Sequence, residues 1–466
     1  MSFLLGNVST AEQRHPARPD SSQRRPDEQK REIDRIYGDL IARRPALLEE
    51  KLKLHGRIID EFNLALLEKL APEELRRQVQ AYVSNYVRAE RISLNQKELE
   101  AFTSEVLAEM IGFGPIEPLL KDPTVSDILI NTHKHCFVER FGRLEQTDVR
   151  FKDEAHLLRI INRIVSGIGR RVDESSPMVD ARLPDGSRVN IAIRPVSIDG
   201  PLVSIRKFAE RPYNMQRLIE VGSLCPAMAE LLQAAVRGRI SLIISGGTGT
   251  GKTTMLNALS HYIPGEERLI TIEDAAELQL QQLHVGRLET RPPNSEGKGE
   301  IRQRDLVKNA LRMRPDRIII GECRGEEAFD MLQAMNTGHE GSMTTIHANS
   351  PPDALKRLEQ MVAMAAMGLP VNSIRSQISS AITLVLQLQR LPDGRRRLIS
   401  IDEITGMQND AVEIHGVFRY VKEETDAQGN VVGYFTATGR RPQFLQALLP
   451  YGIQLPSTHF DPGRRM

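Results

Sequence analysis

The residues from Ile240 to Thr254 read ISLIISGGTGTGKTT, and this stretch decides the fold class of the chain. Its apolar and β-branched start is typical of a buried strand. The glycine-rich part then leads into Lys252, Thr253 and the sequence MLNALSHYI, which is typical of a helix. Glycine allows positive φ angles and lets backbone N–H groups approach an anion. A strand, a glycine-rich turn and a helix in this order predict a phosphate-binding loop in an α/β unit.

The glycine-rich part matches the pattern G-x-x-x-x-G-K-[ST] from Gly246 to Thr253. The N-terminus of the following helix carries about half a positive charge and would face the same anion. Lys252 is expected to reach the β- and γ-phosphates, and the Thr253 hydroxyl is expected to ligate Mg²⁺. The pattern therefore predicts that the chain uses ATP and Mg²⁺. The residues expected to line the phosphates are Gly246, Gly247, Thr248, Gly249, Thr250, Gly251, Lys252, Thr253 and Thr254.

Hydrolysis of ATP also needs an oriented water molecule and neutralisation of the γ-phosphate charge. Two predicted strands downstream of the loop end in carboxylates, the first at Glu273 and Asp274 and the second at Glu322. Glu277 follows closely behind the first pair. In many P-loop proteins the second strand ends in Asp, whereas Gly321 stands at that position here, followed by Glu322. This departure argues against a generic ABC or AAA protein.

Two histidines lie in the segment NTGHEGSMTTIHANSP, at His339 and His347. A single histidine is usually structural, but two near a predicted nucleotide site favour a role for one of them in sensing the γ-phosphate. Their spacing does not match a metal-binding pair such as H-x₃-H.

The composition excludes several classes of protein. Lys and Arg number 62 against 61 Asp and Glu, and Trp is absent, so a nucleic-acid-binding surface is not indicated. The three cysteines are far apart, which is typical of free thiols in a reducing compartment. No apolar run approaches the roughly 18 residues that a membrane span needs. We therefore expect a cytoplasmic protein whose membrane role, if any, comes through partners.

The pattern along the chain predicts several regions in sequence. After about residue 226, strands and helices alternate as in a parallel α/β core, and β-hairpins follow from about residue 381. An α+β region with its own turn signals precedes this core. The expected regions are a disordered leader (1–27), a helical module (28–111), an α+β N-terminal domain (112–208), a linker (209–226), an ATPase domain (227–440) and a C-terminal helix and tail (441–466).

Local signals predict individual elements. In the helical module, apolar residues follow helical spacing from Ile33 to Leu70, Pro72 opens a further helix, and Ser93 is the expected cap of the last one. The residues 125–131 and 136–146 are predicted as two strands, and 154–169 as a helix. A C-terminal helix is expected near 442–449.

The four motifs together resemble those of the secretion ATPase superfamily, which serves type II and type IV secretion and type IV pili. The phosphate-binding loop, TIEDAAEL, RPDRIIIGECRGEEAFDML and TGHEGSMTTIHANSP resemble its Walker A, Asp box, Walker B and His box, in that order. The stretches RPPNSEGKGEIRQRDLVKNALRMRPDRIIIGE and DMLQAMNTGHEGSMTTIHANSP look most like the Tad/Flp pilus assembly branch, the CpaF-like ATPases. The resemblance covers about residues 28–440.

The resemblance implies a RecA-like ATPase domain, a hexameric ring beneath the inner membrane and a membrane platform protein as partner. Glu273 would polarise the attacking water, Glu322 would hold Mg²⁺ or its waters, and the two roles are open to exchange. His347, with His339 less strongly supported, would sense the γ-phosphate. Basic residues expected to contact phosphate on domain closure are Arg188, Arg194 and Arg206. A crowded set between the Asp and Walker B boxes faces either the nucleotide, a neighbouring subunit or solvent: Arg291, Arg302, Arg304, Arg312 and Arg314.

Three functions compete. The first is a motor ATPase that drives assembly, and also retraction, of a Tad/Flp pilus. An ATPase of a related type II/IV secretion or conjugation system is the alternative within this class. The second is a nucleic-acid motor, which the balanced charge disfavours. The third is a scaffold that binds ATP without turnover, but the presence of both Glu273 and Glu322 gives no sign of a degenerate site.

Overall fold

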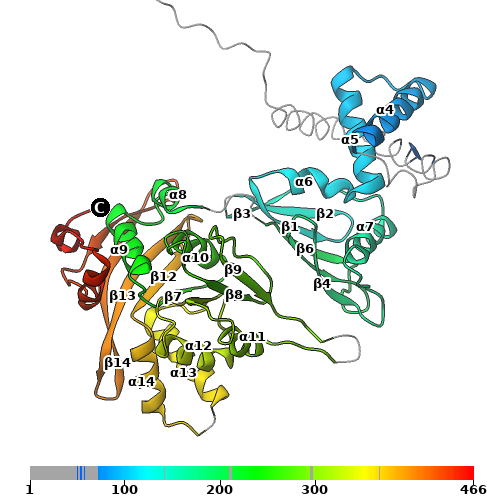
Figure 1. Cartoon of the computed structure of the whole chain (residues 1–466). Coiled ribbons are helices and arrows are strands. Elements are labelled where there is room, and N and C mark those ends of the chain that lie inside the picture. The colour runs from blue at the N-terminus through cyan, green and yellow to red at the C-terminus, as the bar shows by residue number, and fades with distance from the viewer. Residues whose placement is uncertain are drawn as a thin grey trace, which may run out of the picture. The chain divides into compact units, whose positions relative to one another are not determined.

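The computed structural model divides the chain into two compact units, residues 1–208 and 209–466 (Figure 1). It describes residues 50, 53, 54, 57, 72–140, 142–208, 213–293, 298–366 and 368–466. The expected leader and most of the expected helices before Pro72 lie outside these residues.

The first unit contains a helical part built on α4 (Pro72–Ala89) and α5 (Gln96–Ile111). Pro72 opens α4 as predicted, but the cap of α5 is Asn95 rather than Ser93. Asn95 Oδ1 accepts the amide of Glu98 at 2.9 Å, and Glu98 Oε2 accepts the amide of Asn95 at 2.8 Å. This reciprocal pair satisfies two helix-terminal donors at once, which Ser93 cannot do from its position.

A six-stranded antiparallel sheet forms the rest of the first unit, in the order β3-β2-β1-β6-β5-β4. Helix α7 (Glu154–Ser166) packs against it through Leu157, Ile161 and Ile164. The expected strand 136–146 is two strands, because a turn with Gly142 at φ +81° separates them. The strands are β1 (Val125–Asn131), β2 (His135–Arg140), β3 (Arg143–Gln146), β4 (Met178–Arg182), β5 (Arg188–Ala192) and β6 (Leu202–Arg206), and a short η1 (Gly114–Ile116) and α6 (Glu117–Lys121) precede them.

The second unit is built on a nine-stranded sheet in the order β15-β14-β13-β12-β7-β11-β10-β8-β9. The strands from β12 to β9 run parallel to one another, and β13, β14 and β15 extend the sheet as antiparallel hairpins. The predicted α/β, RecA-like fold class is confirmed. The strands are β7 (Leu242–Gly246), β8 (Leu269–Glu273), β9 (Val285–Glu289), β10 (Arg317–Ile320), β11 (Met343–Ile346), β12 (Leu384–Arg390), β13 (Arg396–Gln408), β14 (Ala411–Thr425) and β15 (Val431–Ala437).

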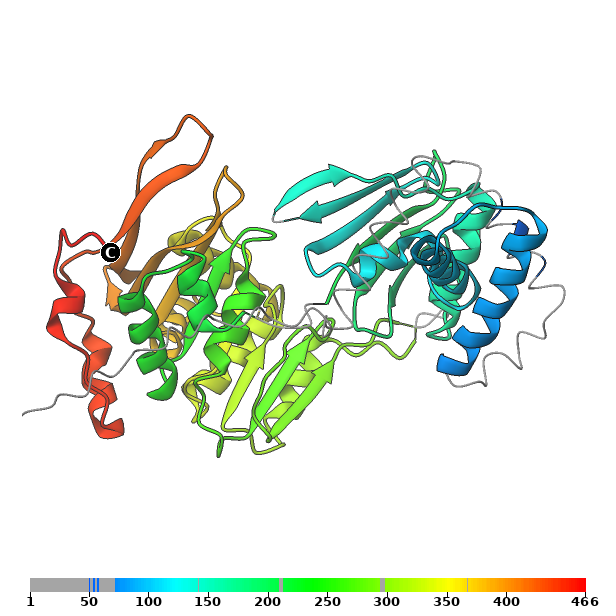
Figure 2. The same ribbon diagram turned by 90° about the horizontal axis from the view of Figure 1, so that it is seen from above.

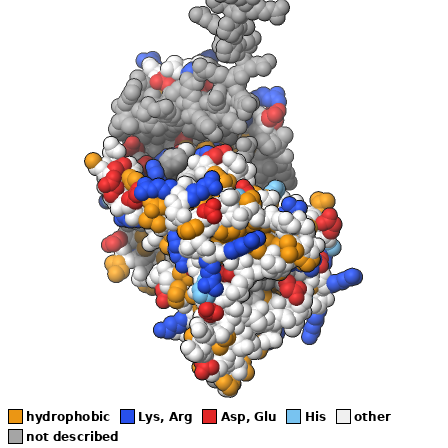
Figure 3. All heavy atoms as spheres, turned by 90° about the vertical axis from the view of Figure 1, so that its left-hand side faces the viewer, with side chains coloured by type: hydrophobic (Ala, Val, Ile, Leu, Met, Phe, Trp, Pro, Cys, Tyr) orange, Lys and Arg blue, Asp and Glu red, His pale blue; other side chains and the backbone are white. Residues whose placement is uncertain are grey.

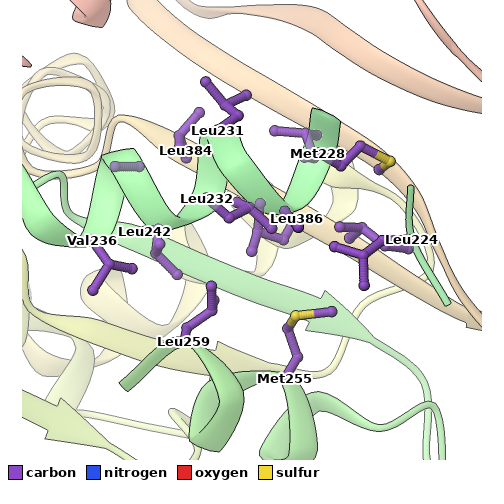
Figure 4. Packing of buried hydrophobic residues seen from close by; sticks show 14 of the residues in the cluster. Leu224, Met228, Leu231, Leu232, Val236, Leu242, Met255, Leu259, Leu384 and Leu386 are labelled. Atoms are coloured by element: carbon purple, nitrogen blue, oxygen red, sulfur yellow. The ribbon is translucent and has the colours of Figure 1, made fainter. Parts of the chain in front are cut away.

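Helices cover both faces of this sheet (Figures 1 and 2). On one face, α9 (Pro226–Arg237) and α10 (Lys252–Ser260) bury an apolar layer in which Leu232 and Leu242 are fully inaccessible. Figure 4 shows the α9 side chains of this layer against residues of β7, β12 and α10. Each fully buried Leu contributes about 1.5–3 kcal/mol. The other face carries α11 (Gln303–Ala310), α12 (Glu327–Asn336), α13 (Pro351–Ala365) and α14 (Val371–Ala381).

Of the expected linker 209–226, the structure describes residues 213–226, and these are not an extended connection. They contain α8 (Met215–Glu220), which is capped by Asn214. Met215 and Leu218 are 3% and 5% exposed and belong to the core of the second unit. Burial of these two apolar side chains makes α8 part of that unit.

The C-terminal helix is a 3₁₀ helix, η2 (Gln443–Tyr451), rather than an α-helix, and η3 (Ser457–Phe460) follows. Pro450 lies inside η2 and has no N–H group with which to extend an α-helical ladder. The first amides of η2 donate to the carboxylate of Glu403 on β13 at 3.0 and 2.8 Å. Across the described part of the chain, we find no helix both long and apolar enough to cross a bilayer.

Candidate functional site

The phosphate-binding loop connects the end of β7 to the start of α10. Gly249 and Gly251 have φ angles of +69° and +95°, which glycine adopts without a steric penalty. A Cβ at Gly246 would lie 2.5 Å from Thr250 Oγ1 and 2.8 Å from the carbonyl oxygen of Leu388, so only glycine fits there. The glycines therefore shape a tight loop at the N-terminus of α10.

Lys252 is the first residue of α10 and is only 7% exposed. Its Nζ donates to the carbonyl oxygens of Gly246 and Gly247 at 3.0 and 2.9 Å. The same Nζ lies 3.1 Å from Nε2 of His347. The lysine predicted from the motif is thus held over the loop and faces the end of β11.

A chain of polar contacts continues from His347 across the ends of three strands. His347 Nε2 lies 3.0 Å from Glu322 Oε1, and Arg324 donates to the other oxygen of Glu322 at 2.8 Å. Arg324 also lies 3.3 Å from Asp274, at the end of β8. Lys252, His347, Glu322, Arg324 and Asp274 form what we call the loop network.

Electrostatics fix the charge states within the loop network. Burial opposes ionisation of Glu322, but the hydrogen bond from Arg324 and the positive charge of Arg324 outweigh it, so the pKa of Glu322 lies below its ordinary value. Burial and the charge of Lys252 lower the pKa of His347, although Glu322 opposes this. Near neutral pH the network therefore holds a carboxylate beside a neutral imidazole.

Glu273 lies at the end of β8 and is 3% exposed. Its Oε1 accepts the amides of Glu277 and Leu278, each at 2.8 Å, whereas its buried Oε2 has no hydrogen-bond partner among the described residues. Burial raises the pKa of Glu273, and the two amide hydrogen bonds only partly offset this effect. A buried carboxylate with one unused oxygen is a candidate proton acceptor.

The glycine at position 321, where many P-loop proteins have Asp, has a structural reason. Its amide donates to the carbonyl oxygen of Ile272 on β8 at 2.9 Å. A Cβ at Gly321 would lie 3.0 Å from Cγ of Glu273, closer than side chains normally pack. Gly321 therefore leaves the space that the side chain of Glu273 occupies.

Thr253 follows Lys252 in the first turn of α10, and Thr254 comes after it. The hydroxyl of Thr253 lies 3.5 Å from Oε2 of Glu277. No group of three or more His, Cys, Asp or Glu residues that could hold a metal ion occurs in the described ranges. A hydroxyl with one carboxylate nearby fits Mg²⁺, which usually takes few protein ligands and keeps its waters and the phosphate oxygens.

His339 does not belong to this site. It precedes β11, whereas His347 follows it, so the two histidines lie at opposite ends of that strand. His339 Nδ1 lies 3.2 Å from the carbonyl oxygen of Ala334 at the end of α12. The expectation of a γ-phosphate contact from His339 was wrong, because β11 carries it to the edge of the sheet away from the loop.

The predicted arginines of the first unit separate into two groups. Arg188 and Arg206 are direct register partners on β5 and β6, and both are exposed. Arg182 on β4 is the register partner of Arg188, so three arginines form a row across the sheet. Arg194 lies beyond the opposite end of β5 and contacts Glu154 at 3.5 Å. The structure therefore does not bring Arg194 together with the other two.

Three of the arginines between the Asp and Walker B boxes contact groups that are close to them in the same unit. Arg304 contacts Glu326 and Asp330, each at 2.8 Å, and joins α11 to α12. Arg302 contacts Glu300 at 2.8 Å, and Arg291 Nε donates to the carbonyl oxygen of Gly299 at 2.7 Å. Arg312 and Arg314 are exposed. Arg302 and Arg304 therefore form ion pairs with nearby carboxylates, whereas Arg291 contacts a backbone carbonyl.

Sequence reasoning missed Arg324 and Arg182. Arg324 stands two residues after Glu322, and this short spacing was the available signal for an ion pair at the strand end. Arg182 becomes notable only from the register of β4 and β5, which no local pattern reveals. Glu277 was noted as an acidic residue but without the contact to Thr253.

The chain is similar in sequence to a known protein family and to several named proteins. The profile of the family described as Type II/IV secretion system protein matches residues 109–424. A Mycobacterium tuberculosis protein named as a candidate conjugal transfer protein is 35% identical over 348 residues, which cover 70% of this chain and 98% of the relative. Conjugal transfer protein TrbB of Rhizobium radiobacter is 32% identical over 294 residues, 62% of this chain and 87% of the relative. Type IV secretion system protein PtlH of Bordetella pertussis is 32% identical over 314 residues, 61% of this chain and 92% of the relative.

Two solved structures are also similar. The VirB11 ATPase of the Brucella suis type IV secretion system, in complex with sulphate, is 29% identical with a TM-score of 0.34, covering 62% of this chain and 94% of its own. The pilus retraction motor PilT with bound ADP is 19% identical with a TM-score of 0.46, covering 61% of this chain and 80% of its own.

Proposed function

The chain belongs to the type II/IV secretion system protein family, and we propose that it is an ATP hydrolase that powers a secretion or pilus-assembly machine. One observation carries the proposal. Lys252 of the phosphate-binding loop contacts His347, and His347 contacts Glu322. A cation, an imidazole and a carboxylate from three separate segments meet beside a loop suited to phosphate, and such a group can position and stabilise a phosphoryl group in transfer.

Each residue has a task in this proposal. The loop amides and Lys252 bind the β- and γ-phosphates, and Lys252 stabilises the negative charge that develops in the transition state. His347 contacts the γ-phosphate and communicates its presence to Glu322. Glu273 takes the proton of the attacking water, because its raised pKa makes it a better base than Glu322.

The metal ion of this proposal is Mg²⁺. The Thr253 hydroxyl would be its protein ligand, and the carboxylates of Glu277 and Glu322 would hold its waters. When bound, Mg²⁺ neutralises phosphate charge and orients the phosphate oxygens. The low pKa of Glu322 suits this task, since it keeps the carboxylate ionised.

We further propose that the machine is a Tad/Flp-type pilus. The similarity of residues 291–322 and 330–351 to that branch supports this. In such a machine the chain would work as a hexamer at the cytoplasmic side of the inner membrane, with a platform protein as its partner. Arg188 and Arg206 would contact phosphate from the first unit when nucleotide is bound.

A related conjugation or type IV secretion system is the alternative, and the conjugal transfer relatives favour it. A direct role on nucleic acid has less support. The chain carries a net charge of +1, and the face of the second unit drawn in Figure 3 shows basic side chains among acidic and hydrophobic ones. Stimulation of hydrolysis by DNA would revive that role.

A phosphate-release assay on the purified chain tests the proposed function. The wild-type protein should release phosphate from Mg·ATP, and Lys252→Ala should lower the rate by about 10²–10³-fold, as expected for loss of a group that stabilises transition-state charge. Lys308→Ala, at an exposed site on α11, is the matched control and should keep the wild-type rate. A Lys252→Ala protein with the wild-type rate and an unchanged circular dichroism spectrum would contradict the proposal.

A further inference from the structure

The hairpin between β12 and β13 passes beside the phosphate-binding loop. Leu388 on β12 is the register partner of Gly246, where β7 ends, so β12 continues two residues further to Arg390. Arg390 is in turn the register partner of Arg396, the first residue of β13. Two arginines therefore stand side by side at the place where the loop begins.

Both arginines approach the glycines that shape the loop. A Cβ placed on Gly249 would lie 3.8 Å from Nη1 of Arg390, and one placed on Gly251 would lie 3.7 Å from Cδ of Arg396. These two glycines carry the positive φ angles of the loop. Larger residues there would therefore meet the arginine side chains as well as an unfavourable backbone conformation.

The side of the loop on which these arginines lie indicates which phosphates they would meet. Strand β12 flanks β7 on one side, and β11 and β10 follow on the other. His347 and Glu322, which we assign to the γ-phosphate, come from the ends of β11 and β10. Arg390 and Arg396 therefore lie on the opposite side of the loop from the γ-phosphate groups.

Backbone contacts hold Arg396 in place. Ser223 Oγ donates to the carbonyl oxygen of Arg396 at 2.9 Å, and the amide of Leu398 donates to the carbonyl oxygen of Ser223 at 2.8 Å. The start of β13 is thus tied to the segment that follows α8. A backbone anchored in this way has less freedom to lose when the Arg396 side chain binds a ligand.

We propose that Arg390 and Arg396 bind the α- and β-phosphates, the part of the nucleotide that ATP and ADP share. This inference rests on the proposed function. The planar guanidinium group of arginine can contact two phosphate oxygens at once, so a pair of arginines beside the loop suits a diphosphate. The β12–β13 hairpin then retains ADP after the γ-phosphate has left.

Equilibrium binding of ADP and of a non-hydrolysable ATP analogue tests the inference. Arg390→Gln and Arg396→Gln should each weaken binding of both nucleotides by about tenfold, the loss expected for one charge-assisted hydrogen bond. The ratio of the two affinities should stay at the wild-type value. Arg395→Gln is the matched control, because Arg395 lies in the same hairpin but its Nε is 3.8 Å from Asp393. This control should bind both nucleotides like the wild type.

Several outcomes would overturn the inference. In the first, Arg390→Gln and Arg396→Gln bind both nucleotides with wild-type affinity, whereas Lys252→Ala does not bind them. This result would contradict the inference but not the proposed function. Another is a loss confined to the ATP analogue, because it would place the arginines at the γ-phosphate. Wild-type nucleotide affinity in Lys252→Ala would instead contradict the proposed function.

The variants Arg390→Lys and Arg396→Lys keep the charge. They show whether a loss of affinity comes from a lost phosphate contact or from a change in folding. They should bind more tightly than the Gln variants and have the thermal stability of the wild type. Losses as large in the Lys variants as in the Gln variants would contradict direct phosphate binding.

Discussion

At Glu273, a carboxylate is buried at the end of a central strand although one of its oxygens has no partner among the described residues. Such a group lowers the stability of the folded protein, so its presence favours a functional role. Gly321 provides the space for it, at the position where related folds have Asp. The sequence predicted Glu273 as a catalytic candidate and showed Gly321 in the place of the usual Asp. It could not predict that Gly321 leaves space for the side chain of Glu273.

Replacement of this carboxylate should stabilise the fold. The pKa of Glu273 is raised in the folded state, so ionisation of Glu273 reduces stability as the pH rises through the interval between the ordinary pKa and the raised one. Glu273→Gln removes this penalty and keeps the acceptor for the two amides. We expect its unfolding temperature to exceed the wild-type value by a few degrees at pH 8 and to match it near pH 4.

Thermal unfolding followed by calorimetry at both pH values measures this difference. Glu289→Gln, on the neighbouring strand β9 and exposed, is the control and should show no pH-dependent gain. A lower unfolding temperature for Glu273→Gln at pH 8 would mean that the ionised carboxylate is a stabilising group.

At the scale of elements, the site depends on parallel strands that end at one edge of the sheet. This principle let the sequence predict that Glu273, Glu322 and His347 gather near the loop. The same principle gave a wrong prediction for His339, because the sequence did not show that β11 begins after this residue. Four strand residues span about 13 Å at 3.3 Å per residue, enough to place two histidines of one motif at opposite edges.

Elements outside the motifs were harder to predict. The segment 209–226 looked like a linker because its polar residues and its Pro and Gly conceal the short helix α8, whose burial depends on distant residues. The register of β4, β5 and β6, which aligns Arg182, Arg188 and Arg206, likewise depends on pairing that only the fold supplies.

The attachment of β13 to the end of α8 should contribute measurably to the stability of the second unit. Arg397 Nη1 donates to the carbonyl oxygen of Gly222 at 3.0 Å, and its guanidinium lies 4.6 Å from the ring centre of Tyr420. Loss of one hydrogen bond and one cation–π contact in Arg397→Ala should cost about 2 kcal/mol. Urea unfolding measures this loss, with Arg441→Ala, at an exposed position, as the control. Equal midpoints for the two variants would show that the attachment is not stabilising.

At the scale of the whole molecule, the chain consists of two compact units, and the first carries a row of three arginines. Asp127 on β1 is the register partner of Arg206, so the row borders a carboxylate on the next strand. We propose that Arg206 contacts the nucleotide of its own chain. Because such a contact exists only while the γ-phosphate is present, hydrolysis would release it.

Mixing of inactive variants tests this proposal. Arg206→Ala should bind ATP but hydrolyse it slowly, and mixing it with Lys252→Ala should restore little activity. If Arg206 instead served a neighbouring subunit, mixed hexamers would contain junctions with both residues intact and would recover activity. Native mass spectrometry of the mixture checks that mixed assemblies near six subunits form. Substantial recovery on mixing would contradict the within-chain contact.

The central claim is that this chain binds ATP at the phosphate-binding loop and hydrolyses it with the help of Glu273. The most direct measurement is the ratio of ATP to ADP recovered from purified protein after incubation with Mg·ATP and rapid removal of free nucleotide. We predict that the wild type yields mainly ADP, that Glu273→Gln yields mainly ATP, and that Lys252→Ala yields little of either. Intact ATP from the wild type, or ADP from Glu273→Gln at the wild-type rate, would contradict the account.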